Sequence, residues 1–118
     1  MDLHLKIWIT QKMGVALIDG FRMHLTCLAS INDSNLISFV DMKWSGLGMK
    51  SLWVNQSDIK KHDNTIKREL FFEPWLDLHA GEYTCHVLVE LNDNNFTWNK
   101  TFLVDSKYYR VITVKYKT

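Results

Sequence analysis

The chain has 118 residues, of which 47% are hydrophobic and 23% are charged, and its formal net charge is +1. A chain of this length forms one domain that buries about two-thirds of its unfolded surface, and the apolar content excludes a disordered polymer. The charges of both signs are interspersed, which excludes the electrostatic signature of nucleic-acid or membrane-surface binding, and no apolar run is long enough to span a bilayer.

The first segment alternates between apolar and other residues. The apolar set is Leu3, Leu5, Ile7 and Ile9, and the other set is His4, Lys6, Trp8 and Thr10. This period of two residues predicts a half-buried strand. The opening residues lack the basic and apolar regions of a signal peptide, so a secreted protein with this sequence is expected to be a fragment or to carry an added methionine.

Further strands are expected as far as residue 104. They cover 21–28, 39–45, 49–54, 65–72, 82–91 and 96–104. The segments between them are a break at 12–14, an edge strand at 15–18 that moves to the other sheet, turns at 19–20, 45–48 and 76–80, a polar connection at 29–38, a charged and polar loop around a weak edge strand at 55–64, and an Asn-rich hairpin loop at 92–95. Pro74 is expected to end its strand, because proline cannot donate to a β-ladder.

Two cysteines and a tryptophan lie at specific points of this strand pattern. Cys27 lies in the strand at 21–28, Trp44 lies in the next strand, and Cys85 closes the segment Tyr83-Thr84-Cys85. The order Cys, Trp, Tyr-x-Cys resembles the core of an immunoglobulin-superfamily domain of the I-set or variable-like kind, over residues 14–104. This resemblance implies an all-β, two-sheet antiparallel sandwich with a Cys27–Cys85 disulfide between the sheets.

The resemblance also predicts the core and shows one departure from the family pattern. The expected core residues are Trp44, Tyr83, Leu70, Phe72 and Trp75. The usual approach to the second cysteine is Asp-x-Gly-x-Tyr-x-Cys, and here His79 stands at the Asp position. An ion pair that this Asp makes in many relatives is therefore in doubt, and we interpret His79 as a local substitution at a turn.

Glycosylation sequons indicate the compartment. Four Asn-x-Ser/Thr sequons occur, at Asn32, Asn55, Asn95 and Asn99, whereas composition alone predicts about one. All four fall in expected loops or at outward-facing strand positions, where a glycan can be carried. The two cysteines alone do not indicate the compartment, because intracellular immunoglobulin domains keep their cysteines reduced. We therefore expect an extracellular or cell-surface location.

The sequence contains no recognisable catalytic or metal-binding motif, and we expect no enzyme activity, no metal and no cofactor. No nucleophile elbow, zinc-protease helix motif or phosphate-binding glycine loop occurs. The five histidines are scattered, and the resemblance places His24 and His86 on opposite sheets, where they point apart. The thiols are expected to be buried and bonded, which removes them as nucleophiles.

Surface residues remain as candidates for binding a partner. Apolar residues expected to face solvent are Trp8, Trp53, Phe71 and Leu88, and large aromatic residues are enriched in interfaces. On the last strand, Phe96, Trp98, Phe102 and Val104 are expected in the core. The opposite set, which includes Asn95 and Asn99, projects outward, so glycans there would shield that sheet face.

A softer resemblance suggests the class of partner. The segments 25–27, 40–44, 70–74 and 83–85 are similar to domains of cytokine and growth-factor receptors, such as the interleukin-1 receptor group and soluble poxviral decoys. This resemblance implies a protein ligand and neighbouring immunoglobulin domains in the same chain. It carries over no binding residue.

We therefore expect residues 1–104 to be an extracellular protein-binding module of a receptor or adhesion ectodomain, without catalysis. Residues 105–118 would extend the last strand or link to a following domain. The alternatives are a secreted soluble decoy or immune modulator, a structural domain of an intracellular immunoglobulin array, and an accessory domain of an enzyme.

Overall fold

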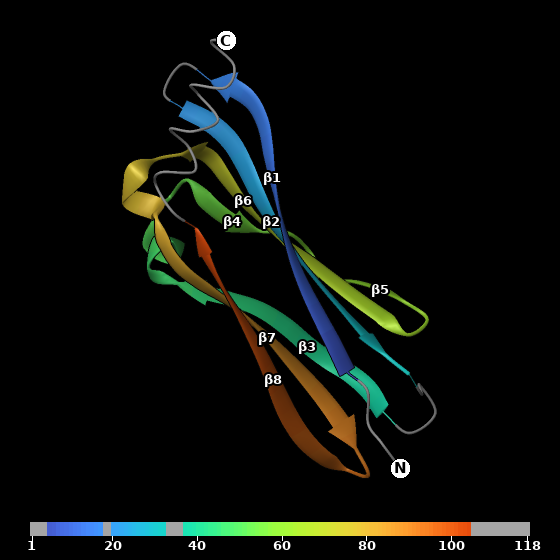
Figure 1. Ribbon diagram of the computed structural model, residues 1–118. Coiled ribbons are helices and arrows are strands. Elements are labelled where there is room, and N and C mark those ends of the chain that lie inside the picture. The colour runs from blue at the N-terminus through green and yellow to red at the C-terminus, as the bar shows by residue number, and fades with distance from the viewer. Residues whose placement is uncertain (1–4, 18–19, 33–36, 105–118) are drawn as a thin grey trace.

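The computed structural model describes residues 5–17, 20–32 and 37–104, without the side chains of 15–21 and 77 (Figure 1). Its strands are β1 (Leu5–Leu17), β2 (Gly20–Ile31), β3 (Ile37–Gly46), β4 (Val54–Gln56), β5 (Lys60–His62), β6 (Thr65–Trp75), β7 (Gly81–Leu91) and β8 (Asn94–Val104). Two short 3-10 helices, η1 (Leu47–Lys50) and η2 (Asp77–His79), lie between strands. Residues 105–118 lie outside the described part.

The strands form two antiparallel sheets. One sheet has the order β1-β2-β6-β4, with β5 also paired to β6, and the other has the order β3-β7-β8. This division is that of a constant-type immunoglobulin sandwich, so the predicted fold class is confirmed. The variable type adds two strands beside the smaller sheet, and within the described residues that sheet has three strands.

The core lies between the sheets and is centred on a disulfide. Cys27 on β2 and Cys85 on β7 are bonded and fully buried, 58 residues apart in sequence. The five expected core residues, Trp44, Tyr83, Leu70, Phe72 and Trp75, are all at most 3% exposed. Phe72 makes edge-to-face contacts with Trp75 and Tyr83, each with ring centroids 5.2 Å apart. These rings fill the sandwich beyond the disulfide, toward η2.

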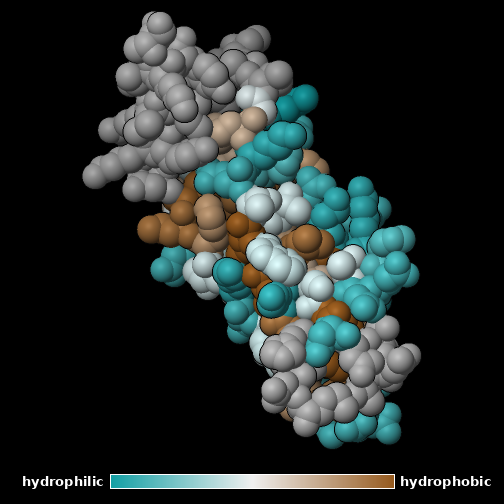
Figure 2. Space-filling view, turned by 45° about the vertical axis from the view of Figure 1, so that its right-hand side comes forward, coloured by the Kyte–Doolittle hydropathy of each residue, from teal (hydrophilic) through white to brown (hydrophobic). Residues whose placement is uncertain are grey.

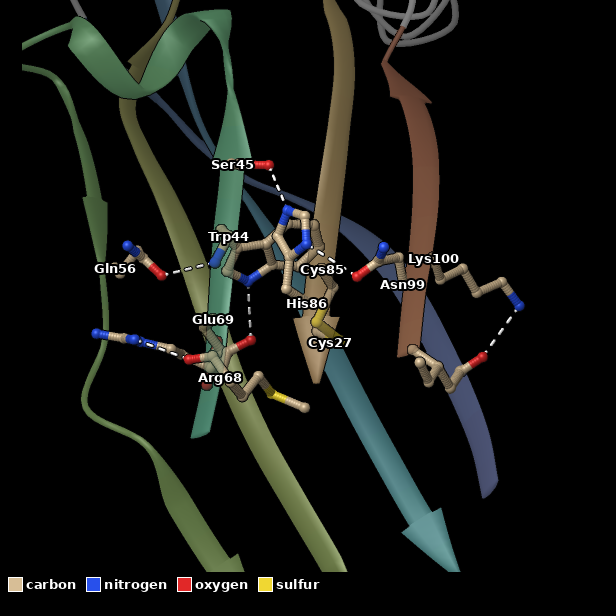
Figure 3. The surroundings of a disulfide bond; sticks show 12 residues. Cys27, Trp44, Ser45, Gln56, Arg68, Glu69, Cys85, His86, Asn99 and Lys100 are labelled. Atoms are coloured by element: carbon tan, nitrogen blue, oxygen red, sulfur yellow. Dashed lines mark hydrogen bonds between the residues drawn. A yellow bond between two sulfur atoms is a disulfide. The ribbon is translucent and has the colours of Figure 1, made fainter. Parts of the chain in front are cut away.

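Trp44 joins the two sheets by hydrogen bonds as well as by packing. Its indole Nε1 donates to the carbonyl of Arg68 on β6 at 3.1 Å, and its backbone N–H donates to Gln56 Oε1 on β4 at 2.9 Å (Figure 3). Arg68 returns the contact by donating to the carbonyl of Met42 on β3 at 2.8 Å. Buried polar groups are costly unless they are paired, so these bonds fix the position of β3 on β6.

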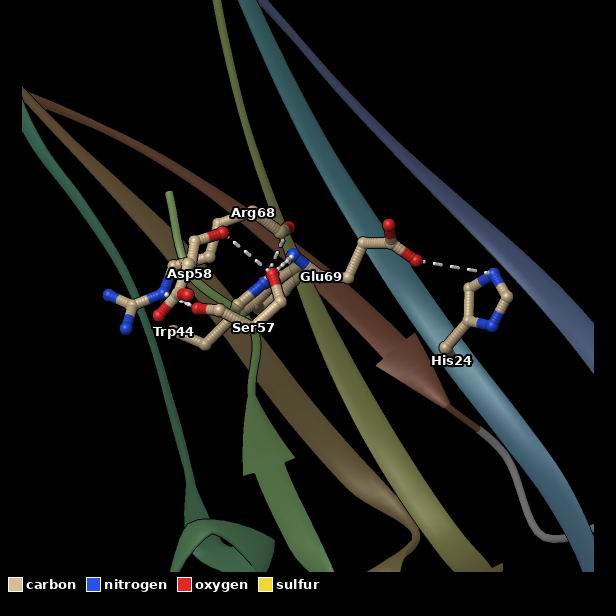
Figure 4. A network of polar contacts seen from close by, with 6 residues as sticks. All are labelled: His24, Trp44, Ser57, Asp58, Arg68 and Glu69. Atoms are coloured by element: carbon tan, nitrogen blue, oxygen red, sulfur yellow. Dashed lines mark hydrogen bonds and ion pairs between the residues drawn. The ribbon is translucent and has the colours of Figure 1, made fainter. Parts of the chain in front are cut away.

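The connection between β4 and β5 is held against β6 by a small polar network (Figure 4). Ser57 Oγ accepts the backbone N–H of Glu69 at 2.9 Å and donates to the carbonyl of Asp58 at 2.9 Å. Arg68 Nε donates to the carbonyl of Ser57 at 2.7 Å, and the Glu69 carboxylate lies 3.7 Å from His24 Nε2 on β2. The segment predicted at 55–64 as a loop around a weak edge strand does contain a short strand, β5, and its first two residues belong to β4.

Lys100 connects the open edges of the two sheets. Lys100 on β8 stands opposite Cys85, and its Nζ donates to the carbonyl of Ile7 on β1 at 3.0 Å. The predicted move of residues 15–18 to the other sheet is wrong as far as Leu17, because β1 stays paired with β2 throughout. The break at 12–14 is a register shift between Met13 and Ala16, and Ile18 lies outside the described residues.

Three other predicted boundaries are also wrong. The polar connection at 29–38 is shorter, because Ala29 and Ile31 continue the buried set of β2 and β3 begins at Ile37. The strand predicted at 49–54 is mostly η1 and a turn, and its last residue, Val54, starts a strand paired with β6. Pro74 does not end β6. It occupies a bulge where the β2–β6 register shifts, so no ladder bond is lost there.

The residues of β8 alternate between outward and inward positions as expected, but Phe96, one of the inward residues, is not buried. Val104 is buried, and Trp98 and Phe102 are half-buried against the core. Phe96, which was also predicted in the core, is 43% exposed and packs on Trp98, with ring centroids 6.1 Å apart. Its strand is a sheet edge, so only one neighbouring strand supports it.

Replacing Cys85 by Ala is expected to lower the free energy of unfolding by about 4 kcal/mol, because the disulfide closes a long loop in the unfolded chain. That loss is comparable with the whole stability of a small domain, so secretion of folded protein should be abolished. Secreted yield and urea denaturation measure both effects. Glu90→Ala, an exposed position on the same strand, is the matched control, and normal secretion of the Cys85 variant would sink the structural role of the bond.

Candidate functional site

The four residues predicted as partner contacts do not form one surface. Trp8 on β1 and Trp53, which precedes β4, are 43% and 52% exposed. Phe71 on β6 is half-buried against His24, with ring centroids 5.6 Å apart. Leu88 is half-buried on β7, in the other sheet. Of the four, only Trp53 lies where other exposed apolar residues gather.

That gathering is at the end of the sandwich formed by η1, the turn after it, and η2. Its large exposed side chains are Leu47 (83%), Leu52 (89%), Trp53 (52%) and Leu78 (71%), and we call these four residues the apolar end. Leu103, opposite Glu82 where β8 nears its end, is also exposed. β8 ends on the same side of the molecule as both 3-10 helices (Figure 1). Exposed leucines in such number are unusual on a monomeric domain.

The segments of the apolar end are tied together by hydrogen bonds. Ser51 Oγ is 3.0 Å from His79 Nε2, which links the turn after η1 to η2. The backbone N–H of Ser51 donates to the carbonyl of Gly48 at 3.0 Å, and that of Glu73 donates to the carbonyl of Trp53 at 2.9 Å. The exposed side chains are therefore displayed on a fixed backbone.

Tyr83 supports this end from inside the core. Its hydroxyl donates to the carbonyl of His79, which is the tyrosine corner expected of this fold. Burial raises the pKa of Tyr83 to about 12, so the hydroxyl stays protonated. A Cβ on Gly48 would overlap the Tyr83 hydroxyl, so only glycine lets η1 pack this closely on the corner.

His79 is a buried part of the same corner. It is 1% exposed, its Nδ1 accepts the backbone N–H of Leu76 at 3.0 Å, and its ring packs on Phe72 and Trp75. An unprotonated Nδ1 requires a neutral ring, with the proton on Nε2 facing Ser51. Burial lowers the pKa of His79 from its usual 6.5. His79 is thus held at this corner by neutral hydrogen bonds.

A second polar feature crosses the outer face of the three-stranded sheet (Figure 3). Ser45 Oγ lies 2.7 Å from His86 Nε2, and His86 Nδ1–H donates to Asn99 Oδ1 at 2.9 Å. We call these three residues, on β3, β7 and β8, the polar row. A hydroxyl, an imidazole and an amide in series is also the arrangement that activates the nucleophile of hydrolases.

Among the described residues, the surroundings of the polar row are those of an ordinary sheet face. Acyl transfer needs oriented donors for the oxyanion, but the polar row stands on a regular sheet in which Ser45 pairs with Thr84 and His86 with Lys43. The backbone N–H of Trp44, beside Ser45, is donated to Gln56. We therefore interpret the polar row as an element that positions Asn99.

Beside the polar row lies a shallow hollow of about 450 Å³. It is lined by Asp41, Lys43, Ser45, His86, Leu88 and Thr97. Two sequon residues, Asn95 and Asn99, flank Thr97 on the outer face of β8. The side chains of all four sequon asparagines are exposed, whereas Asp33 and Ser34 of the first sequon lie outside the described residues.

The histidines of the described residues are not assembled for metal binding. His24 and His86 lie on opposite sheets, as expected, and within the described ranges no group of three His, Cys, Asp or Glu side chains is placed to hold a metal ion. His24 faces Glu69, and the exposed His62 lies 3.4 Å from Asp63. Both contacts are ordinary surface pairs.

Three of the four residues of the apolar end were missed at the level of sequence. Leu47 and Leu78 lie in the turns expected at 45–48 and 76–80, and Leu52 lies in the strand expected at 49–54, which is a turn in the structure. The available signal for Leu47 and Leu78 was their position, because leucines in turns have no sheet face to cover. Such residues either fold back on the core or remain exposed.

No protein-family model matches the chain, and no curated protein matches it with significant similarity. None of the helices in the described part is long and apolar enough to cross a membrane. The fold class therefore rests on the sheet topology and the core.

His79 should make stability depend on pH below neutrality. In the unfolded chain this side chain takes up a proton near pH 6.5, the usual pKa of histidine, whereas in the folded chain burial lowers its pKa. The free energy of unfolding should therefore fall as the pH decreases below 6.5, by up to about 1.4 kcal/mol per pH unit. His79→Asn keeps an acceptor for the Leu76 N–H and should flatten this dependence. Urea denaturation between pH 5 and 8 measures it.

The matched control is His62→Asn, because the side chain of His62 is 89% exposed. This variant should keep the full pH dependence of the unmodified protein. Equal slopes in the His79 and His62 variants would refute the assignment.

Proposed function

We propose that this chain is a non-catalytic, extracellular protein-binding module of a receptor or adhesion ectodomain, and that it contacts its partner through the apolar end. The observation that carries the proposal is the exposure of Leu47, Leu52, Trp53 and Leu78 on one hydrogen-bonded end. Burying a leucine side chain is worth about 1.5–3 kcal/mol, so a partner that covers this end gains a large apolar contribution.

The shape of the surface favours a protein partner over a small molecule. Small-molecule sites are concave and enclose their ligand, whereas these four side chains project from helices and turns. A central apolar set with polar neighbours is the usual composition of a protein interface. On the face drawn in Figure 2, several hydrophobic patches lie at the left and in the centre among near-neutral and hydrophilic residues.

Two features support the extracellular part of the proposal. The Cys27–Cys85 disulfide is of the kind that persists in oxidising compartments, and the four sequon asparagines are exposed, so each has room for a glycan. Membership of the immunoglobulin superfamily is part of the same proposal. The similarity of its core segments to cytokine-receptor domains favours a secreted or cell-surface protein as the partner.

The direct test is a binding screen with matched variants. The secreted, biotinylated domain is presented as a tetramer to a panel of secreted and cell-surface ectodomains. The double variant Leu52→Glu/Leu78→Glu should bind the partner at least about tenfold more weakly, because central apolar contacts contribute most of the binding energy. Surface plasmon resonance measures the affinity.

Val40→Glu is the control variant, because Val40 is exposed to 42% at a bulge of β3 far along the strand from η1. It should bind like the unmodified domain. A partner that tolerates the leucine changes and is lost with Val40→Glu would overturn the assignment of the surface, and a screen without any partner would count against a binding module.

A further inference from the structure

The polar row holds the side chain of Asn99 in one orientation. His86 Nδ1–H donates to Asn99 Oδ1, and Ser45 fixes the imidazole from the other side (Figure 3). The amide oxygen of Asn99 is therefore turned toward the sheet, and its Nδ2 is the atom left for a substituent. Thr101, the third residue of the same sequon, is hydrogen-bonded to Thr84 on β7 at 2.8 Å.

This orientation is compatible with modification of Asn99. In N-glycosylation the Nδ2 forms a bond to the anomeric carbon of an N-acetylglucosamine, the bond from that carbon to a lipid-linked diphosphate breaks, and Nδ2 loses one proton. The oxygen Oδ1 keeps its lone pairs, so the bond from His86 persists in the glycosylated residue. The polar row then anchors the first sugar.

The hollow beside the polar row lies within reach of that sugar. Thr97, which lines the hollow, is two residues before Asn99 on the same outer face of β8, about 7 Å away at the rise of a β-strand. The hollow offers the carboxylate of Asp41, the ammonium of Lys43 and the apolar surface of Leu88. A pyranose presents hydroxyl groups on its rim and C–H groups on its faces, which these residues complement.

We propose that Asn99 carries an N-linked glycan whose first sugars lie in this hollow and cover the outer face of the three-stranded sheet. The inference rests on the extracellular location proposed above. It assigns the two surfaces different roles, because a glycan on this face excludes a protein partner there and leaves the apolar end free. A glycan at Asn55, on the edge strand β4 of the other sheet, serves as an internal control, because Asn55 is not among the residues that line this hollow.

Glycopeptide mass spectrometry of the secreted domain first measures occupancy at Asn99 and Asn55. The native protein is then treated with an endoglycosidase that cleaves between the first two sugars. The Asn99 glycan should be released several-fold more slowly than the Asn55 glycan. His86→Ala should remove the difference, and Ser45→Ala provides a second variant that weakens the same polar row.

Three results would overturn the inference: an unoccupied Asn99, equal release rates in the unmodified protein, or a slow rate that survives both variants. An unoccupied Asn99 beside an occupied Asn55 would remove the glycan-covered face and leave the extracellular binding module intact. Loss of partner binding in the Leu52/Leu78 variant tests the proposed function separately, because neither leucine lines the hollow.

Discussion

The disulfide between Cys27 and Cys85, with Trp44 packed beside it, is the constraint on which the rest of the structure depends. It joins the central part of β2 to β7 and so fixes one sheet over the other. Trp44 adds hydrogen bonds to β4 and β6, which set the position of β3. Beyond it, the packing of Phe72 against Tyr83 extends the core to the end of the sandwich.

At the end of the sandwich, core residues hold the segments that carry the exposed leucines. The Tyr83 hydroxyl and the neutral ring of His79 together hold η1, η2 and the turn between η1 and β4. The leucines there remain exposed because hydrogen bonds hold the backbone that carries them in place. The polar row on the three-stranded sheet has a different character, since its side chains satisfy one another and leave a hollow. The fold thus presents an apolar end and a polar face, on which the two proposals rest separately.

The sandwich and its core could be predicted from the sequence, because a two-residue period and the Cys, Trp, Tyr-x-Cys order depend on positions that burial enforces. The predicted strand boundaries were wrong where contacts between residues distant in sequence determine them. Ala29 and Ile31 extend β2 as buried residues, and Val54 pairs with Phe72 of β6, which is distant in sequence. His79 does lie at the expected turn, but its burial depends on Ser51 and Phe72, which are distant in sequence, and could not be predicted.

The most direct test of this account is the intact mass of residues 1–118 secreted from eukaryotic cells behind an added signal peptide, taken without reductant before and after N-glycosidase treatment. The account predicts a product that carries several glycans and whose deglycosylated form gains the mass of about two hydrogen atoms when it is then reduced, because reduction of the Cys27–Cys85 bond adds one hydrogen to each sulfur. An unglycosylated product with two free thiols would contradict it, and the structural domain of an intracellular array would then be the better description.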